Sequence, residues 1–374
     1  MKKATFEKNQ FCPEKHIEET AIIASLDPLK ADEVLKTLPQ MNASQDLGIL
    51  ISVTKTLVPD LEEIGHYSYY QALAAVRDLG MFAGSIKKHG VEPAQAVPAL
   101  EPVLLKLGQM TDMPPRDTVL HVCLWNPEGE RQRTYTIHGD EKQLIASTKR
   151  AIPQLENAIQ GLILLHELPL NSPEFVSQCE QCGKDLSGMV EAVVHTMKNV
   201  SRKIFAEELR CYYDSITLQG KQYLGPGAVE LPLYIFDHLL WSVECLDESY
   251  VNFKEALVPY CLPILRKVYA KFKEQPSLLA KVYRELNNAQ ASKSRILDGA
   301  NALMVLFNIL VKFRMPHKKL VDQAYVYEPK KVREKGSGGY PPEMLASLNT
   351  LTLDAREKLS ENINRYKEKE LVFQ

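Results

Sequence analysis

The sequence predicts an all-α fold, a helical bundle, and three observations support this prediction. Apolar residues recur at steps of three and four along most of the chain, which is the spacing of one buried helix face. Segments that alternate as strands do are nearly absent, and the weak alternation of 131–137 predicts only a short hairpin arm. Proline and glycine cluster at a few breaks, as in helices joined by turns.

The clearest helical pattern lies near the C-terminus. One apolar stripe there comprises Leu345, Leu348, Thr352, Ala355, Leu359 and Ile363. Similar patterns cover 69–88, 142–168, 175–198 and 263–272. The clearest breaks in the first half are Pro114-Pro115 and the segment 126–130. They predict a smaller N-terminal helical domain, residues 1–130, and a larger helical domain, residues 131–374.

The composition is that of an ordinary globular protein. The chain has 374 residues, of which 25% are charged, and a net charge of −2. Because there is no excess of basic residues, nucleic acid is a poor candidate partner. The first residues lack the apolar stretch of a secretory signal, and the most apolar run, 302–311, is too short to span a bilayer. We therefore expect a cytoplasmic protein without a membrane partner, in which 302–311 is a buried core helix.

The cysteines predict free thiols. There are seven, at widely spaced positions, and an odd count argues against a disulfide framework. Cys179 and Cys182 form a Cys-x-x-Cys pair, but no second pair completes the four ligands of a structural zinc site. We expect these two thiols on a helix surface.

His317 is the first candidate for chemistry. It follows Pro316, directly after an apolar helix that the pattern ends near Phe313. Proline suits the first turn of a helix, where its missing N–H leaves nothing unpaired. The pattern therefore predicts that a new helix begins here, with His317 held rigidly at its start. That suits an axial iron ligand, whose imidazole needs a fixed orientation. Considered alone, a helix-start histidine facing solvent is the commoner case.

A glycine-rich segment, Gly336-Ser337-Gly338-Gly339, precedes the last predicted helix. Glycines allow positive φ and close backbone approach to a ligand. Their N–H groups and the Ser337 hydroxyl could hold a carboxylate at the start of that helix. The alternative is a flexible linker after the charged segment 330–335.

Two further segments carry candidate binding residues. Gly225 and Gly227 lie in a turn before the apolar segment 231–241, where backbone could lie flat against a planar cofactor; a plain core helix is the alternative. Phe205 and Arg210 are five residues apart, about 140° apart on an α-helix, so only a curved pocket could use both. Arg210 could pair with a carboxylate or form a surface salt bridge.

Taken together and in this order, these segments resemble the monodechloroaminopyrrolnitrin synthase family. The resemblance covers nearly the whole chain. It is carried by 75–80 (Ala-Val-Arg-Asp-Leu-Gly), 100–105 (Leu-Glu-Pro-Val-Leu-Leu), 124–127 (Leu-Trp-Asn-Pro), 224–230 (Leu-Gly-Pro-Gly-Ala-Val-Glu), Pro316-His317 and 336–340 (Gly-Ser-Gly-Gly-Tyr). The family consists of haem enzymes of pyrrolnitrin biosynthesis that rearrange 7-chlorotryptophan, divergent relatives of the indoleamine and tryptophan dioxygenases. The resemblance implies the helical bundle of those dioxygenases, with haem in the larger C-terminal domain.

For the cofactor, the resemblance implies that His317 is the proximal iron ligand. Arg314 matches an arginine that approaches a haem propionate in the dioxygenases. Gly225 and Gly227 match a loop near the haem, in which Pro226 replaces a serine and its hydroxyl is missing.

For the substrate, the resemblance implies a phenylalanine against the indole at Phe205 and an arginine on the carboxylate at Arg210. Ser337 and Gly338 belong to the loop that closes over the amino-acid part, and Tyr325 matches an active-site tyrosine. Ser337 and Tyr325 are thus the candidate catalytic residues. Because Tyr325 is about 12 Å from His317 along a continuous helix, the two would do separate jobs. Ser147 is a candidate distal side chain.

The resemblance implies an enzyme that holds haem b (iron protoporphyrin IX) and uses dioxygen and an electron donor. Its reaction is an oxidative transformation of the indole of L-tryptophan or 7-chloro-L-tryptophan. The alternatives are ring-opening dioxygenation to N-formylkynurenine, a haem- or tryptophan-binding sensor without turnover, and a plain α-helical interaction module. Chlorination of the substrate and the oligomeric state stay open, with a homodimer among the options.

Overall fold

The computed structural model describes residues 11–227, 231–288, 295–327 and 341–372. Over these ranges the fold is all-α, as predicted, and the only strands form a two-stranded antiparallel ribbon, β1 (Ile216–Leu218) and β2 (Lys221–Tyr223). The ribbon turns at Gln219 and Gly220, which both have positive φ, as a two-residue hairpin turn requires.

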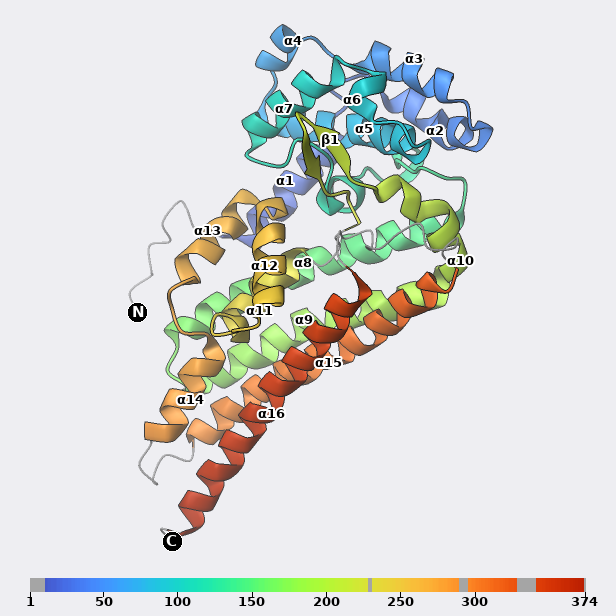
Figure 1. Cartoon of the computed structure of the whole chain (residues 1–374). Coiled ribbons are helices and arrows are strands. Elements are labelled where there is room, and N and C mark those ends of the chain that lie inside the picture. The colour runs from blue at the N-terminus through green and yellow to red at the C-terminus, as the bar shows by residue number, and fades with distance from the viewer. Residues whose placement is uncertain (1–10, 228–230, 289–294, 328–340, 373–374) are drawn as a thin grey trace.

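The shorter helices of the first part of the chain gather at one end of the molecule (Figure 1). They are α1 (Pro13–Ser25), α2 (Asp32–Ser44), α3 (Leu47–Leu57), α4 (Leu61–Gly65), α5 (Tyr69–Lys88), α6 (Pro93–Ala96) and α7 (Leu100–Thr111). Their starts follow local chemistry. Ser68 and Gln71 form a reciprocal capping box at α5, and the Asp46 carboxylate accepts the N–H of Ile49 at α3.

Four long helices form the body and run away from that end (Figure 1). They are α8 (Gly139–Glu167), α9 (Pro173–Asn199), α15 (Arg295–Tyr325) and α16 (Pro342–Val372). Shorter helices flank them: α10 (Arg202–Ile204), α11 (Leu231–Asp237), α12 (Glu248–Leu257), α13 (Pro263–Phe272) and α14 (Leu278–Asn288). Single turns complete the fold: the π-helical η1 (Leu120–Leu124), η3 (Phe205–Leu209) and η5 (His238–Ser242), and the 3₁₀ η2 (Gly129–Arg131), η4 (Arg210–Tyr213) and η6 (Val258–Tyr260).

The helices predicted from periodicity are confirmed. The segments 69–88, 142–168, 175–198 and 263–272 correspond to α5, α8, α9 and α13. The predicted C-terminal stripe is the buried face of α16. The run 302–311 lies within α15, the single described helix long and apolar enough to cross a membrane, and half of its most apolar window is buried inside the structure. That burial agrees with a core helix.

The predicted hairpin arm at 131–137 is wrong. The backbone N–H groups of Tyr135 and Thr136, which a partner strand would need, instead donate to the Glu141 carboxylate at 2.7 and 2.8 Å. Arg133 and Tyr135 are fully buried on either side of Thr134. With its donors already paired, the segment has no need of a partner strand.

The expectation of surface thiols at Cys179 and Cys182 is also wrong. Both are buried, and α9 uses them as small packing residues. Cys182 donates to the Ala158 carbonyl of α8 at 3.3 Å. A Cβ added to Gly161 of α8 would lie 3.2 Å from the Cβ of Cys182. On another side of α9, a Cβ at Gly183 would approach Ile309 of α15 to 3.2 Å. Small residues on α9 therefore let it lie close to both α8 and α15.

Two hydrophobic cores fill the structure. The smaller comprises α2–α7 together with Tyr135, Tyr212, Tyr213 and the apolar face of β1, while the larger comprises the long helices. The motif 75–80 joins them. Arg77 pairs with Asp78 and also donates to the carbonyls of Ile23, Leu26 and Trp125. The domain division near residue 130 stays a prediction, since the smaller core draws residues from both sides of it.

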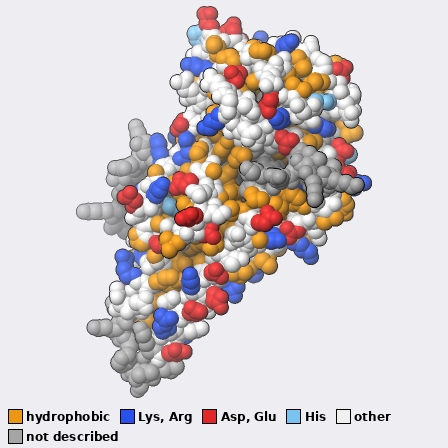
Figure 2. All heavy atoms as spheres, viewed as in Figure 1, with side chains coloured by type: hydrophobic (Ala, Val, Ile, Leu, Met, Phe, Trp, Pro, Cys, Tyr) orange, Lys and Arg blue, Asp and Glu red, His pale blue; other side chains and the backbone are white. Residues whose placement is uncertain are grey.

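The surface is of mixed charge on the face shown in Figure 2. Basic and acidic side chains are interspersed there, and hydrophobic side chains gather over the middle of the molecule.

A buried ion pair between α1 and α8 makes a first prediction. His16 Nδ1 lies 2.7 Å from Glu156 Oε2. Burial lowers the pKa of His16, but the hydrogen bond and charge of Glu156 outweigh burial and raise it above its ordinary value of 6.5. A raised pKa in the folded state gives stability that is complete below pH 6.5 and is lost as pH rises through the folded-state pKa.

We therefore expect His16→Gln to lower the free energy of unfolding by about 1.5–3 kcal/mol below pH 6.5, and by less as pH rises. Urea unfolding of both proteins on either side of that pH measures this. His66→Gln, at an exposed histidine, is the control and should show no such trend. A His16→Gln deficit that stays constant with pH would contradict the prediction.

Candidate functional site

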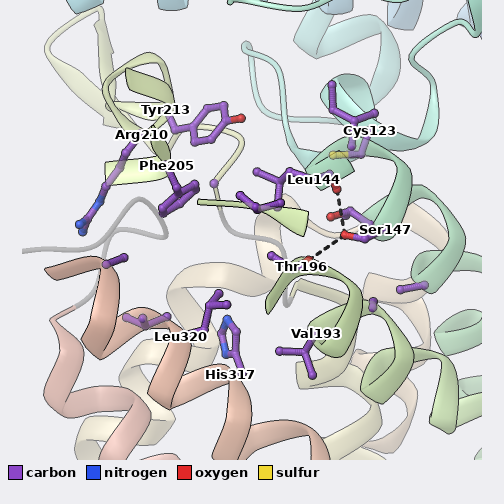
Figure 3. Close-up of a pocket in the computed structure, with 18 of the residues that line it drawn as sticks. Cys123, Leu144, Ser147, Val193, Thr196, Phe205, Arg210, Tyr213, His317 and Leu320 are labelled. Carbon is purple, nitrogen blue, oxygen red and sulfur yellow. Dashed lines mark hydrogen bonds between the residues drawn. The ribbon is translucent and has the colours of Figure 1, made fainter. Parts of the chain in front are cut away.

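A mostly apolar cavity of about 170 Å³ lies among α8, α9, α15 and the turns η1, η3 and η4. Its walls are aliphatic for the most part, with Ile152, Leu155, Met189, Val193, Leu320 and Leu345 among the lining residues. Polar side chains line it on separate sides: in Figure 3, His317 comes from α15, Ser147 and Thr196 lie on the α8 and α9 side, and Arg210 lies beside Phe205. An enclosed apolar space with a few convergent polar groups is the usual form of a small-molecule site.

His317 lines this cavity from α15 (Figure 3). Its ring stacks on that of Phe313, one turn earlier, with centroids 5.4 Å apart and planes 10° apart. The predicted helix start at Pro316 is wrong, because α15 runs unbroken from Arg295 to Tyr325. Phe313 and Arg314 before the proline and Ala324 after it are buried, so packing on both sides of Pro316 supports the helix. His317 is thus presented from mid-helix.

Phe205 and Arg210 both line the cavity, although α-helical geometry would point them apart. The reason is the π-turn η3, in which the Phe205 carbonyl accepts the backbone N–H of Arg210. In a π-turn, residues five apart are joined by one hydrogen bond and stand about one turn apart. The expected 140° separation is therefore wrong, and one wall of the cavity can use both side chains.

Tyr325 completes this side of the cavity. The Arg210 guanidinium lies over the Tyr325 ring, 4.4 Å from its centroid, a cation–π contact. The Tyr325 hydroxyl is buried and has no hydrogen-bond partner among the residues described. His317 and Tyr325 lie on one continuous helix, about 12 Å apart along its axis. The continuous helix is confirmed, and the separate roles of the two residues stay a prediction.

A pair of hydroxyl groups lies on the α8 and α9 side (Figure 3). Ser147 Oγ donates to the Leu144 carbonyl at 3.1 Å and lies 3.0 Å from Thr196 Oγ1. The nearby Cys123 thiol also lines the cavity. Burial raises the pKa of Cys123 to about 12, so the thiol stays protonated at neutral pH.

Of the three residues expected near the cofactor besides His317, only Gly227 lines the cavity. Gly225 lies outside the lining. A Cβ on Gly225 would lie 1.9 Å from the Tyr213 carbonyl oxygen, so this glycine allows close approach of two backbone segments. Arg314 also lies outside the lining and forms a buried ion pair with Asp237. The haem contacts expected of these residues stay predictions.

Ser337 and Gly338 lie outside the described residues. Their predicted contact with the amino-acid part of the substrate therefore stays a prediction.

Several polar lining residues were not predicted from the sequence, among them Arg202 and Thr196. Arg202 donates to Gln323 Oε1 of α15 and to the Val200 carbonyl, both at 3.3 Å. Ser201 caps the short helix α10, which is a readable start signal. The direction of the next side chain depends on how α10 packs on α15, and periodicity does not contain that information.

Among the described residues, the fold and cavity define a class: a helical protein with one imidazole in an apolar cavity and two guanidinium groups on its wall. The family model for monodechloroaminopyrrolnitrin synthase PrnB matches residues 20–372, nearly the whole chain. The chain belongs to this family, whose members are tryptophan-modifying enzymes of pyrrolnitrin biosynthesis.

Proposed function

We propose that the chain binds haem b in this cavity through His317 and, with dioxygen and an electron donor, oxidatively transforms the indole of L-tryptophan or 7-chloro-L-tryptophan. The observation that carries the proposal is the placement of His317 on the wall of an apolar cavity, in a chain that matches the synthase family over 353 residues, 20–372. A rearranged product is the family's outcome, and N-formylkynurenine is the alternative product.

The donor set fits an iron porphyrin. The His317 imidazole would hold the iron, and the aliphatic walls would suit the apolar surface of a porphyrin. Arg202 and Arg210 supply positive charge for carboxylates, whether those of the porphyrin or that of an amino acid. Within the described residues there is no group of three or more His, Cys, Asp or Glu side chains placed to hold a metal ion directly.

The haem, when bound, supplies the iron at which dioxygen reacts. The chain then has three tasks: to hold the cofactor, to orient the amino acid and to exclude water. His317 performs the first, and its stacking on Phe313 limits rotation of the ring. The aliphatic walls exclude water, and the exclusion of water strengthens every polar contact inside the cavity.

Residues of η3 and η4 orient the amino acid. Phe205 offers an aromatic face to the indole, and Arg210 offers two parallel N–H groups to the carboxylate. The cation–π contact with Tyr325 fixes the plane of that guanidinium. The Tyr325 hydroxyl can donate to the same amino-acid part. Holding two reactants in a reactive arrangement supplies a large part of catalysis.

Proton chemistry at the opposite wall is restricted. Ser147 and Thr196 can donate or accept hydrogen bonds but do not ionise near neutral pH. The raised pKa of Cys123 keeps it a neutral thiol, so it acts as part of the wall. The electron-rich indole can react without a strong base from the protein, which agrees with this neutral set of groups.

The ligand assignment predicts the behaviour of His317→Ala. Wild-type protein should bind one equivalent of haemin with a sharp Soret band, and the variant should lose stoichiometric binding because the imidazole that would hold the iron is missing. Added imidazole should restore the band in part. His66→Ala, at an exposed histidine far from the cavity lining, should bind haemin as the wild type does. Unchanged haem binding and an unchanged Soret band in His317→Ala would refute the assignment.

The carboxylate assignment predicts a selective loss in Arg210→Gln. Its dissociation constant for L-tryptophan should rise about 10–100-fold, the range expected for hydrogen bonds to a charged group. The constant for tryptamine, which lacks the carboxylate, should stay nearly unchanged. Isothermal titration of both ligands measures this, with Arg150→Gln, at an exposed arginine, as control. Equal weakening for both ligands would contradict the assignment.

A further inference from the structure

Helix α15 has a weak point beside His317. Pro316 lies in the helix interior and has no N–H, so the carbonyl of Lys312 lacks its usual intrahelical donor. A helix bends most readily where such a bond is missing. A histidine that must stay in one position therefore needs support from outside α15.

Arg314, in the same turn of α15 as His317, contacts helices outside α15. The residue is 3% exposed, and it lies outside the cavity lining. One guanidinium nitrogen pairs with the Asp237 carboxylate at the end of α11, and the other donates to the Thr352 hydroxyl of α16. Arg314 thereby connects α11 and α16 to the turn that carries His317.

Asp237 is itself held in place. It is fully buried, and its carboxylate accepts Trp241 Nε1 at 3.0 Å and the Tyr250 hydroxyl at 3.5 Å. Trp241 belongs to η5 and Tyr250 to α12, and their rings stack with centroids 5.6 Å apart. The carboxylate is therefore a fixed point to which Arg314 is bound, and none of these residues lines the cavity.

We propose that Asp237 is a positioning residue for the iron ligand: acting through Arg314, it fixes the turn of α15 that carries His317. This inference rests on the proposed function, in which His317 binds haem iron. It gives Arg314 a role different from the propionate contact expected from the resemblance. Residues that orient a metal ligand commonly affect metal affinity 10–100-fold when they are changed.

The test compares Asp237→Asn with Asp117→Asn. Asp117 is an equally buried carboxylate, paired with Arg116, and neither residue lines the cavity. Each variant removes one buried charge, so general loss of stability is matched. In haem-loaded protein, Asp237→Asn should raise the rate of haem transfer to apomyoglobin about tenfold or more. It should also shift the iron–histidine stretching band of the ferrous protein in resonance Raman spectra, and Asp117→Asn should do neither.

A second variant and a hydrogen-exchange measurement test the same positioning role. Thr352→Val leaves the ion pair between Arg314 and Asp237 intact. It should change the haem transfer rate and the iron–histidine band in the same direction as Asp237→Asn, but less. This variant tests the positioning role if Asp237→Asn does not fold. Hydrogen exchange in haem-free protein should be faster for the amides of 312–318 in Asp237→Asn than in Asp117→Asn.

The outcomes separate the two proposals. If wild-type protein shows no histidine-ligated haem, the proposed function fails, and hydrogen exchange alone reports whether Asp237 holds this turn. If wild-type protein shows that ligation and the Asp237 and Thr352 variants leave the stretching band, the haem transfer rate and the exchange unchanged, the positioning role is overturned.

Discussion

The close approach of α9 to α8 and α15 is the constraint on which the rest of the structure depends. The cavity exists between these helices, and its size follows from how near they lie at their closest points. Gly161, Cys182 and Gly183 set that distance, because larger side chains there would meet the neighbouring helix. The cavity lies further along the same helices, between 144–155 of α8 and 189–200 of α9, and aliphatic side chains form much of its lining. The Cys-x-x-Cys-Gly motif is therefore explained by packing.

The cavity combines apolar walls with polar groups on separate sides. His317 comes from α15, the hydroxyls of Ser147 and Thr196 from α8 and α9, and Arg210 from the π-turn after α10. A planar hydrophobic cofactor and an amphipathic amino acid both need such a division. Their ring systems require dry walls, and their carboxylates require a cation at one edge. Distant segments of the chain supply these groups, so the site exists only in the folded protein.

Much of the fold could be predicted, because amphipathic periodicity reports the buried face of a helix directly. The four cavity residues His317, Phe205, Arg210 and Tyr325 were predicted as a set from the resemblance, and the structure brings them together. The geometry that joins Phe205 to Arg210 was not predictable, since a π-turn inserts one residue without changing the apolar pattern. Pro316 was misread as a helix start because local preference for proline was outweighed by packing along α15. Arg314 has a partner 77 residues away, and no local pattern reveals that.

One measurement tests the central claim most directly: anaerobic titration of the haem-loaded, ferrous protein with L-tryptophan, followed in the Soret region. A site in which His317 holds the iron and the opposite face receives an indole predicts a saturable spectral shift that ends at one tryptophan per haem. A protein that takes up no stoichiometric haem, or whose ferrous spectrum is indifferent to tryptophan at every concentration, would contradict the account.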